Sequence, residues 1–240
     1  MWVGTMRVLL LADVHANWDA LLAVQRAEPQ PDAVLFAGDA VGYGPDPAPC
    51  VRWLLAHATL AVRGNHDEAL ITQQRAGVPA ELEDAAAETL AYARRIVPES
   101  DRERLSRWPV SASMALGGAR FHAVHGTPVD PLRGELNPAT CSAPELHALF
   151  DPIAADIILL GHTHVPAIRQ LDDRLIVNPG SLGQPRYGVP DATYAVWEDG
   201  HLQIRHLHYD HAAPARKLRL TPLSPEVIEQ LSDILETGLS

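Results

Sequence analysis

Short apolar runs alternate with helical patterns along the first part of the sequence, and this alternation constrains the fold more than any other feature. The runs Arg7 to Ala12, Ala33 to Ala37 and Ala58 to Val62 have the length of buried strands. Helical patterns at 17–28 and 45–54 separate these runs, and the second begins with prolines, which the first turn of a helix tolerates. The βαβαβ order predicts a mainly parallel sheet with helices packed on it.

The rest of the chain departs from this rhythm. Residues 68–107 are strongly helical, and Ser100 and Glu103 have the spacing of a capping box. Further strands are expected at 120–124, 156–160, 174–177, 193–197 and 201–207. A last helix begins at Ser224. We therefore expect one α/β domain over residues 1–240, with a helical insertion at 68–107.

Polar side chains of a few types follow five of the predicted strands at the point where each strand ends. In chain order they are Asp13, His15, Asp39, Asn65, His66, Asp67, His125, His162 and His164. Because the carboxyl ends of strands in open α/β sheets lie at one edge, these side chains are expected to converge. Each fragment alone is weak, since Asp, Asn and Gly are also ordinary turn residues. Five such coincidences together favour a site.

The residue types in this set indicate a metal centre. Two carboxylates, four imidazoles and one amide oxygen suit Mn, Fe, Zn or Co, whereas softer metals prefer thiolates. Seven ligands can hold two ions if one carboxylate bridges them. Two ions about 3.5–4 Å apart can clamp the attacking and leaving oxygens of an in-line displacement at phosphorus.

The ordered motifs resemble the five blocks of the calcineurin-like metallophosphoesterases, and Asn178 to Arg186 further resembles the small bacterial phosphodiesterase branch. The resemblance implies a four-layer αββα sandwich, in which two mixed sheets pack together with helices outside. It implies that one ion is bound by Asp13, His15 and His164. It implies that the other is bound by Asn65, His125 and His162, and that Asp39 bridges the two.

The resemblance also implies a reaction and its catalytic residues. His66 would protonate the leaving oxygen or stabilise charge on the phosphoryl group, and Asp67 would orient His66. The expected enzyme is a dinuclear phosphodiesterase that uses Mn, with Fe, Zn or Co as alternatives. It would hydrolyse a small phosphate ester or nucleotide by in-line attack of a metal-bridging hydroxide. The alternatives are a phosphomonoesterase, a dinucleoside polyphosphate hydrolase, or a binding scaffold without turnover.

Two features depart from the resemblance. Members of the branch commonly have Gly after the first histidine, where this chain has Ala16. The helical stretch 68–107 is longer than in the shortest relatives. It is expected either to cap the site or to pack on the sheet without reaching it.

Composition restricts the partners and the location. The formal net charge of −11 disfavours a nucleic-acid backbone as the main partner, because that binding depends on Lys and Arg. Polar residues interrupt every apolar run before it could span a bilayer, and no secretory signal is recognisable. The two cysteines, Cys50 and Cys141, lack metal-ligand spacing and are expected to be reduced. A cytoplasmic enzyme is expected, and no sequence feature indicates its oligomeric state.

Several other residues have two readings. Tyr43 could stack on a ring of the substrate or pack on neighbouring prolines, and Arg186 could bind phosphate or pair with a surface carboxylate. Asp199-Gly200 predicts a hairpin between the last two strands. Four histidines surround this hairpin, where the sequence alone disfavours a second metal site: His201, His206, His208 and His211.

Overall fold

Strand β1 (Arg7–Leu11) lies in the middle of the first of two sheets because its side chains are buried on both faces. In the computed structural model, which describes residues 6–239, this sheet has the order β10-β9-β1-β2-β3. Strands β1, β2 and β3 are parallel, whereas β9 is antiparallel to β1 and to β10. The other strands are β2 (Ala33–Phe36), β3 (Leu60–Ala61), β9 (Ala192–Glu198) and β10 (His201–Leu207).

The second sheet has the order β4-β5-β6-β8-β7. Its strands are β4 (Ser111–Leu116), β5 (Ala119–Val124), β6 (Ile157–Leu159), β7 (Ala167–Leu171) and β8 (Arg174–Asn178). Strands β5, β6 and β8 are parallel, and the two edge strands, β4 and β7, are antiparallel to their neighbours. Both sheets are therefore mixed.

Alternate residues of β1 face the two sides of the first sheet. Val8 and Leu10 pack against Phe121 and Ile157 of the second sheet, and this layer forms the core between the sheets. Leu9 and Leu11 face the opposite way and belong to the core beneath the helices α1 (Trp18–Ala27) and α2 (Pro47–His57). Helix α6 (Ala143–Phe150) covers the outer face of the second sheet. The expected four-layer sandwich is confirmed.

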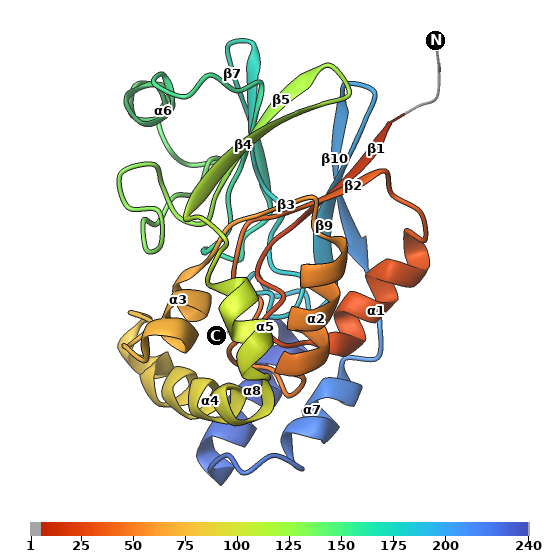
Figure 1. Cartoon of the computed structure of the whole chain (residues 1–240), viewed down its shortest axis with the longest axis vertical. Helices are drawn as coiled ribbons and strands as arrows, with labels where there is room; N and C mark the ends of the chain where they lie inside the picture. Colours follow the sequence, from red (N-terminus) through yellow and green to blue (C-terminus); the bar gives the residue numbers. More distant parts are fainter. Residues whose placement is uncertain (1–5, 240) are drawn as a thin grey trace.

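The remaining helices gather in the lower half of Figure 1, beyond the sheets. They are α3 (Asn65–Thr72), the 3-10 turn η1 (Ala80–Leu82), α4 (Glu83–Ile96), α5 (Glu99–Leu105), α7 (Ala212–Leu218) and α8 (Pro225–Thr237). A separate apolar cluster joins α4 to α7 and α8. Every helix within residues 6–239 is too short or too polar to cross a bilayer.

Four elements escaped the sequence-based expectations: β4, β7, α6 and α7. Strands β4 and β7 lie at sheet edges and are partly exposed, so they lack the long apolar run of a buried strand. The expected capping box at Ser100 is wrong, because α5 begins at Glu99 directly after Pro98. Ser142 and Glu145 form such a box instead, at the start of α6.

Candidate metal centre

All nine predicted site residues lie together at the carboxyl ends of β1, β2, β3, β5 and β6, where the two sheets meet. Backbone hydrogen bonds connect the loops that carry them. His15 N–H donates to the carbonyl oxygen of Asp39 at 3.0 Å, and Gly161 N–H donates to that of His125 at 2.9 Å. The convergence expected from the strand order is therefore present.

Five of the seven candidate ligands have a left-handed backbone, a conformation that non-glycine residues seldom adopt. Their φ angles are 52° at Asp13, 44° at His15, 62° at Asp39, 71° at His162 and 59° at His164. Such strain persists only where surrounding structure enforces it, and it concentrates at functional sites. The loops hold their side chains inward at a conformational cost.

The same constraint acts on Ala16, whose φ is 52°. A left-handed alanine is strained and glycine is not, so Ala16→Gly is expected to stabilise the protein by roughly 0.5–1 kcal/mol. Urea unfolding would measure this difference. Ala23→Gly in helix α1 is the matched control and should be destabilising, because glycine weakens a helix interior. An Ala16→Gly midpoint at or below that of the wild type would contradict the expectation.

One half of the centre consists of acceptor atoms that face each other. His15 and His164 use their Nδ1 atoms to donate to the carbonyl oxygens of Val41 (3.0 Å) and Gln184 (2.6 Å). Their Nε2 atoms consequently carry lone pairs, yet these two atoms lie 2.9 Å apart. Asp13 Oδ1 is 3.5 Å from His164 Nε2. A cation among these three groups turns the repulsion into attraction, so they fit a metal ion.

The other half follows the same rule. His125 donates through Nδ1 to the Ala37 carbonyl oxygen at 2.8 Å, so in the neutral ring Nε2 is bare, and this atom lies 2.9 Å from Asn65 Oδ1. Asn65 is turned this way because its Nδ2 donates to the Ala76 carbonyl oxygen at 3.2 Å. His162 Nδ1 is 3.3 Å from His125 Nε2. These groups fit a second ion.

Asp39 lies between the two halves. Its Oδ2 atom is 3.8 Å from His15 Nε2 and 3.3 Å from His125 Nε2. Its Oδ1 atom accepts the backbone N–H of His66 at 2.9 Å. The carboxylate therefore has the position that a bridging ligand requires.

Burial determines the charge of most of these imidazoles. It lowers the pKa of His162 to about 3 and holds those of His15 and His164 well below the ordinary value. Neutral imidazole is the form that binds metal. His125 differs, because the charge of Asp39 outweighs burial and raises its pKa to about 9.

The two carboxylates respond in opposite directions. Burial raises the pKa of Asp13 to about 8, although the nearby His125 acts against this effect. Burial acts on Asp39 too, but the surrounding imidazoles, His125 foremost, hold the pKa of its carboxyl well below the ordinary value. A cation bound between them would favour the ionised form of both.

His66 lies beside these groups and has a free ring nitrogen. Its ring packs against Tyr43 and His15, with centroids 4.6 Å and 5.0 Å apart, and its buried Nδ1 has no hydrogen-bond partner among residues 6–239. Gly42 makes room for this ring, because a Cβ atom there would lie 2.3 Å from His66 Nδ1. The imidazole is thus held by shape and can still form a hydrogen bond.

Asp67, which was expected to orient His66, makes no hydrogen bond to the His66 ring within residues 6–239. Asp67 accepts the backbone N–H groups of Asp39 (2.9 Å), Ala40 (2.9 Å) and Gly64 (3.2 Å) instead. Asp67 is the third residue of α3, where a carboxylate reaches back to the free N–H groups at the helix start. It therefore fixes the Asp39 loop, not the His66 ring.

The segment 178–186 forms hydrogen bonds to the loops that carry the candidate ligands, a role that the sequence did not reveal. Ser181 Oγ donates to the Asp13 carbonyl oxygen at 2.7 Å. Asn178 Nδ2 donates to the Gly161 carbonyl oxygen at 2.7 Å and to Thr163 Oγ1 at 3.0 Å. These contacts hold the loops of Asp13 and of His162. The signal for them was the cluster of turn residues Asn-Pro-Gly-Ser, whose partners only the fold identifies.

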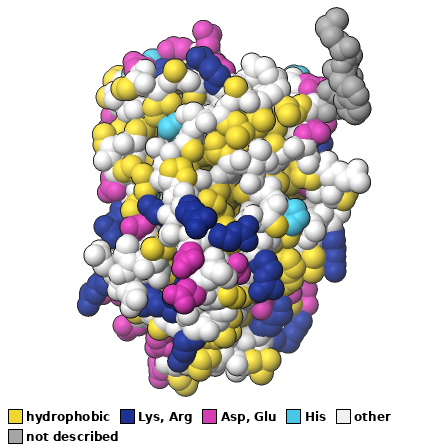
Figure 2. Space-filling model, viewed as in Figure 1, with side chains coloured by type: hydrophobic (Ala, Val, Ile, Leu, Met, Phe, Trp, Pro, Cys, Tyr) yellow, Lys and Arg dark blue, Asp and Glu magenta, His cyan; other side chains and the backbone are white. Residues whose placement is uncertain are grey.

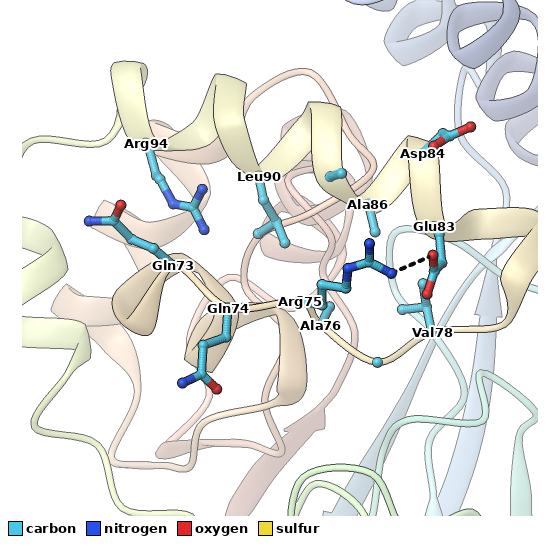
Figure 3. Close-up of a pocket in the computed structure, with 12 residues that line it drawn as sticks. Gln73, Gln74, Arg75, Ala76, Val78, Glu83, Asp84, Ala86, Leu90 and Arg94 are labelled. Carbon is cyan, nitrogen blue, oxygen red and sulfur yellow. Dashed lines mark hydrogen bonds and ion pairs between the residues drawn. The ribbon is translucent and has the colours of Figure 1, made fainter.

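A cavity of about 440 Å³ opens onto the centre. Its lining includes Asp39, Asn65, His66, His162 and His164, together with Tyr43, Val78, Glu135 and Arg186. A second cavity of about 230 Å³ shares Gly77 and Val78 with it (Figure 3). Arg75 lies at that second cavity and pairs with Glu83 at 3.0 Å. The segment around Gly77 is thus a wall between two cavities.

Comparison with known proteins assigns the family. Residues 6–199 match the model of the calcineurin-like phosphoesterase superfamily domain. A crystal structure of a metallophosphoesterase from Sphaerobacter thermophilus is 28% identical and has a TM-score of 0.81, covering 98% of this chain and 100% of that one. An uncharacterized protein of Methanocaldococcus jannaschii is 25% identical over 222 residues, which cover 85% of this chain and 88% of that protein.

A further match covers a shorter part of the chain. The symmetrical bis(5'-nucleosyl)-tetraphosphatase of Chromohalobacter salexigens is 35% identical over 100 residues, or 41% of this chain and 34% of that protein. The domain match covers the strands that bring the nine site residues together, and the whole-chain likeness extends through the C-terminal helices. The resemblance noted in the sequence is confirmed, and the chain belongs to the calcineurin-like phosphoesterase superfamily.

Proposed function

We propose that this chain is a dinuclear metal-dependent phosphodiesterase acting on a small phosphate ester or nucleotide. Members of the superfamily use a dinuclear metal site and hydrolyse phosphate esters. The observation that supports activity in this chain is the position of Asp39, between two groups of ligand atoms that bound cations would draw together. A bound pair of such ions supplies Lewis acidity and lowers the pKa of water.

The two halves of the centre divide the ligands between the ions. Asp13, His15 and His164 would hold one, and Asn65, His125 and His162 the other, while Asp39 contributes to both. Imidazole, carboxylate and amide donors suit Mn, which we propose as the native metal, and also Fe, Zn or Co.

His66 would act on the leaving oxygen. Burial lowers its pKa to about 4, so the ring is neutral near pH 7 and donates a hydrogen bond without bringing a positive charge. Its N–H can donate a hydrogen bond to the leaving oxygen and stabilise the negative charge that develops there, whereas full proton transfer would require the imidazolium form. The packing of Tyr43 and the space left by Gly42 keep the ring at the mouth of the centre.

Among residues 6–239, Arg186 is the only lysine or arginine that lines the cavity at the centre. Its guanidinium lies 5.5 Å from the centroid of the Tyr43 ring, and Nη2 donates to Gln184 Oε1 at 2.8 Å. Its buried Nε has no hydrogen-bond partner in the same described part of the chain. We propose that this side chain binds a non-bridging oxygen of the phosphate.

Arg186→Gln is expected to lower kcat/KM roughly 10- to 100-fold, the value of one charged hydrogen bond. The loss should fall mainly on KM, because the ligands and His66 are untouched. Steady-state kinetics on a chromogenic diester would measure it. Arg26→Gln, an exposed change on α1, is the matched control. An unchanged KM would assign Arg186 to packing on Tyr43 alone.

The lining charges favour a diester over a monoester. Apart from Asp39, a proposed metal ligand, the cavity lining contains one cation, Arg186, and one anion, Glu135. A diester carries a single negative charge, whereas a monoester has a second pKa near 6 and approaches a dianion at pH 7. The smaller charge suits this lining better.

The insertion 68–107 contributes to the cavity through Gly77, Val78 and Pro79. We propose that this segment caps one side of the site as part of a single domain. The contact between Asn65 Nδ2 and the Ala76 carbonyl oxygen supports this role, because it connects the insertion directly to a proposed ligand. The other reading, a helical hairpin that only packs on the sheet, leaves the cavity-lining residues unexplained.

Two alternatives share the metal centre. The match to a symmetrical bis(5'-nucleosyl)-tetraphosphatase favours a dinucleoside polyphosphate hydrolase, and a phosphomonoesterase would need the same ligands. A nucleic-acid substrate is disfavoured by the surface as well. On the face shown in Figure 2, Lys and Arg side chains are mixed with Asp and Glu and form no broad basic stripe.

Initial rates on a chromogenic diester and the matching monoester test the proposal, with Mn²⁺ and with a chelator. Faster turnover of the diester that the chelator abolishes is expected. Faster turnover of the monoester would make the protein a phosphatase. If neither substrate reacts, a dinucleoside polyphosphate is tested next. Its hydrolysis would indicate a dinucleoside polyphosphate hydrolase, and no hydrolysis would indicate a non-catalytic scaffold.

A further inference from the structure

A second group of metal-ligand side chains lies away from the centre, where three segments of the chain meet. Asp191 directly precedes β9, His208 directly follows β10, and His211 directly precedes α7. None of the three lines the cavity at the centre. The hairpin of β9 and β10 is in register from Ala192 to Leu207, so it brings Asp191 and His208 side by side.

The distances within this group are close to the spacing of ligands around one ion. Asp191 Oδ1 is 3.1 Å from His208 Nδ1 and 3.5 Å from His211 Nε2, and the three atoms lie within 4.8 Å of one another. Two ligands of a tetrahedral ion with bonds of about 2.0–2.2 Å are roughly 3.3–3.6 Å apart. The His208 and His211 ring centroids are 4.8 Å apart, close to the 4.7 Å between His15 and His164.

His211 has a nitrogen that the protein leaves unsatisfied. Its Nε2 is buried and has no hydrogen-bond partner among residues 6–239, although it points toward the Asp191 carboxylate. The side chain is only 14% exposed, because the ring of Tyr209 packs against it at 4.7 Å. A buried polar atom without a partner costs about 1–3 kcal/mol, and a bound cation would remove that cost.

We propose that Asp191, His208 and His211 form a peripheral metal site. Two imidazoles and one carboxylate favour a borderline divalent ion such as Zn²⁺. The side chain of His208 is 81% exposed, so the rest of the coordination sphere is open to water. The ion in this site therefore exchanges with solvent.

The three segments that this ion joins also position the C-terminal helices. Lys217 of α7 pairs with Asp19 at 2.7 Å and with Asp46 at 2.8 Å, which fixes α7 against the first sheet's helices. In α8, Leu231 and Leu235 line a small cavity that His15 also lines. The ion would therefore fix the start of the C-terminal segment formed by α7 and α8. Its role would be to stabilise the packing of these helices near the metal centre.

Metal content per chain tests the site. The wild type, His208→Ala and His211→Ala are each equilibrated with Zn²⁺, freed of unbound ion and analysed for zinc. Both variants are expected to hold one equivalent less than the wild type, and added Zn²⁺ should raise their Tm less. His201→Ala, which removes an exposed imidazole at the far end of β10, should match the wild type.

Equal zinc content in the wild type and His208→Ala would overturn the proposal. That variant decides the question even if His211→Ala fails to fold, because the His208 side chain is mostly exposed. The comparison counts only the difference between two proteins with identical centres. Its outcome is therefore independent of whether the protein hydrolyses a phosphodiester.

Discussion

Asp39→Asn is expected to reduce kcat by roughly 10³-fold or more, the scale of losing a main electrostatic contributor to the reaction. The change replaces a charged oxygen between the two halves of the centre by an amide. The Asp39 Oδ2 atom lies 3.3 Å from His125 Nε2, so an N–H placed there would oppose a cation. The kinetics would be measured on a diester with saturating Mn²⁺, together with metal content, which should also fall.

Asp173→Asn provides the matched control, since Asp173 is an exposed turn residue that does not line the cavity at the centre. It should retain wild-type rate and metal content. An Asp39→Asn protein that is folded, binds two equivalents of Mn²⁺ and turns over normally would show that Asp39 is not a bridging ligand.

His66→Ala is expected to lower kcat roughly 10²- to 10⁴-fold, the usual contribution of a proton donor. Metal content should be unchanged, because we propose that His66 is a neighbour of the ligands and not one of them. This combination separates the variant from any ligand substitution. A substrate with a better leaving group should reduce the defect, since it needs less help from a proton.

His57→Ala removes an exposed histidine on α2 and serves as the control. Equal rates for His66→Ala and the wild type would indicate a contaminating enzyme or a reaction that needs no proton donor. A defect that is the same for good and poor leaving groups would instead assign His66 to binding the phosphoryl group.

The sequence predicted the site better than it predicted the sheets around it. The ligand residues were recognisable because each follows a buried strand, and buried strands have a clear apolar signature. Strand β4 lacked that signature, since it lies at an edge and half of its residues face solvent. The Asp199-Gly200 turn indicated the antiparallel pair of β9 and β10, whereas the mixed order of the second sheet came only from the family resemblance.

Contacts between distant segments were beyond sequence reasoning for a different reason. Asp67 had two kinds of neighbour within reach, an imidazole and free backbone N–H groups, and the start of α3 decided between them. Asp191 and His208 are 17 residues apart and meet only because the β9–β10 hairpin pairs in one register. The two-residue Asp199-Gly200 turn sets that register, so this meeting follows from a hairpin signal in the sequence, whereas the approach of His211 does not.

The left-handed loops have a consequence for how this family can change over evolutionary time. Positions such as Asp13 and His15 are under two constraints. The side chain must be able to bind metal, and the residue must tolerate a left-handed backbone that most residues avoid. A descendant that lost catalysis would be freed from the first constraint but would keep the second. Asn and Gly should therefore be the first replacements at these positions, whereas Val and Ile would be excluded by folding alone.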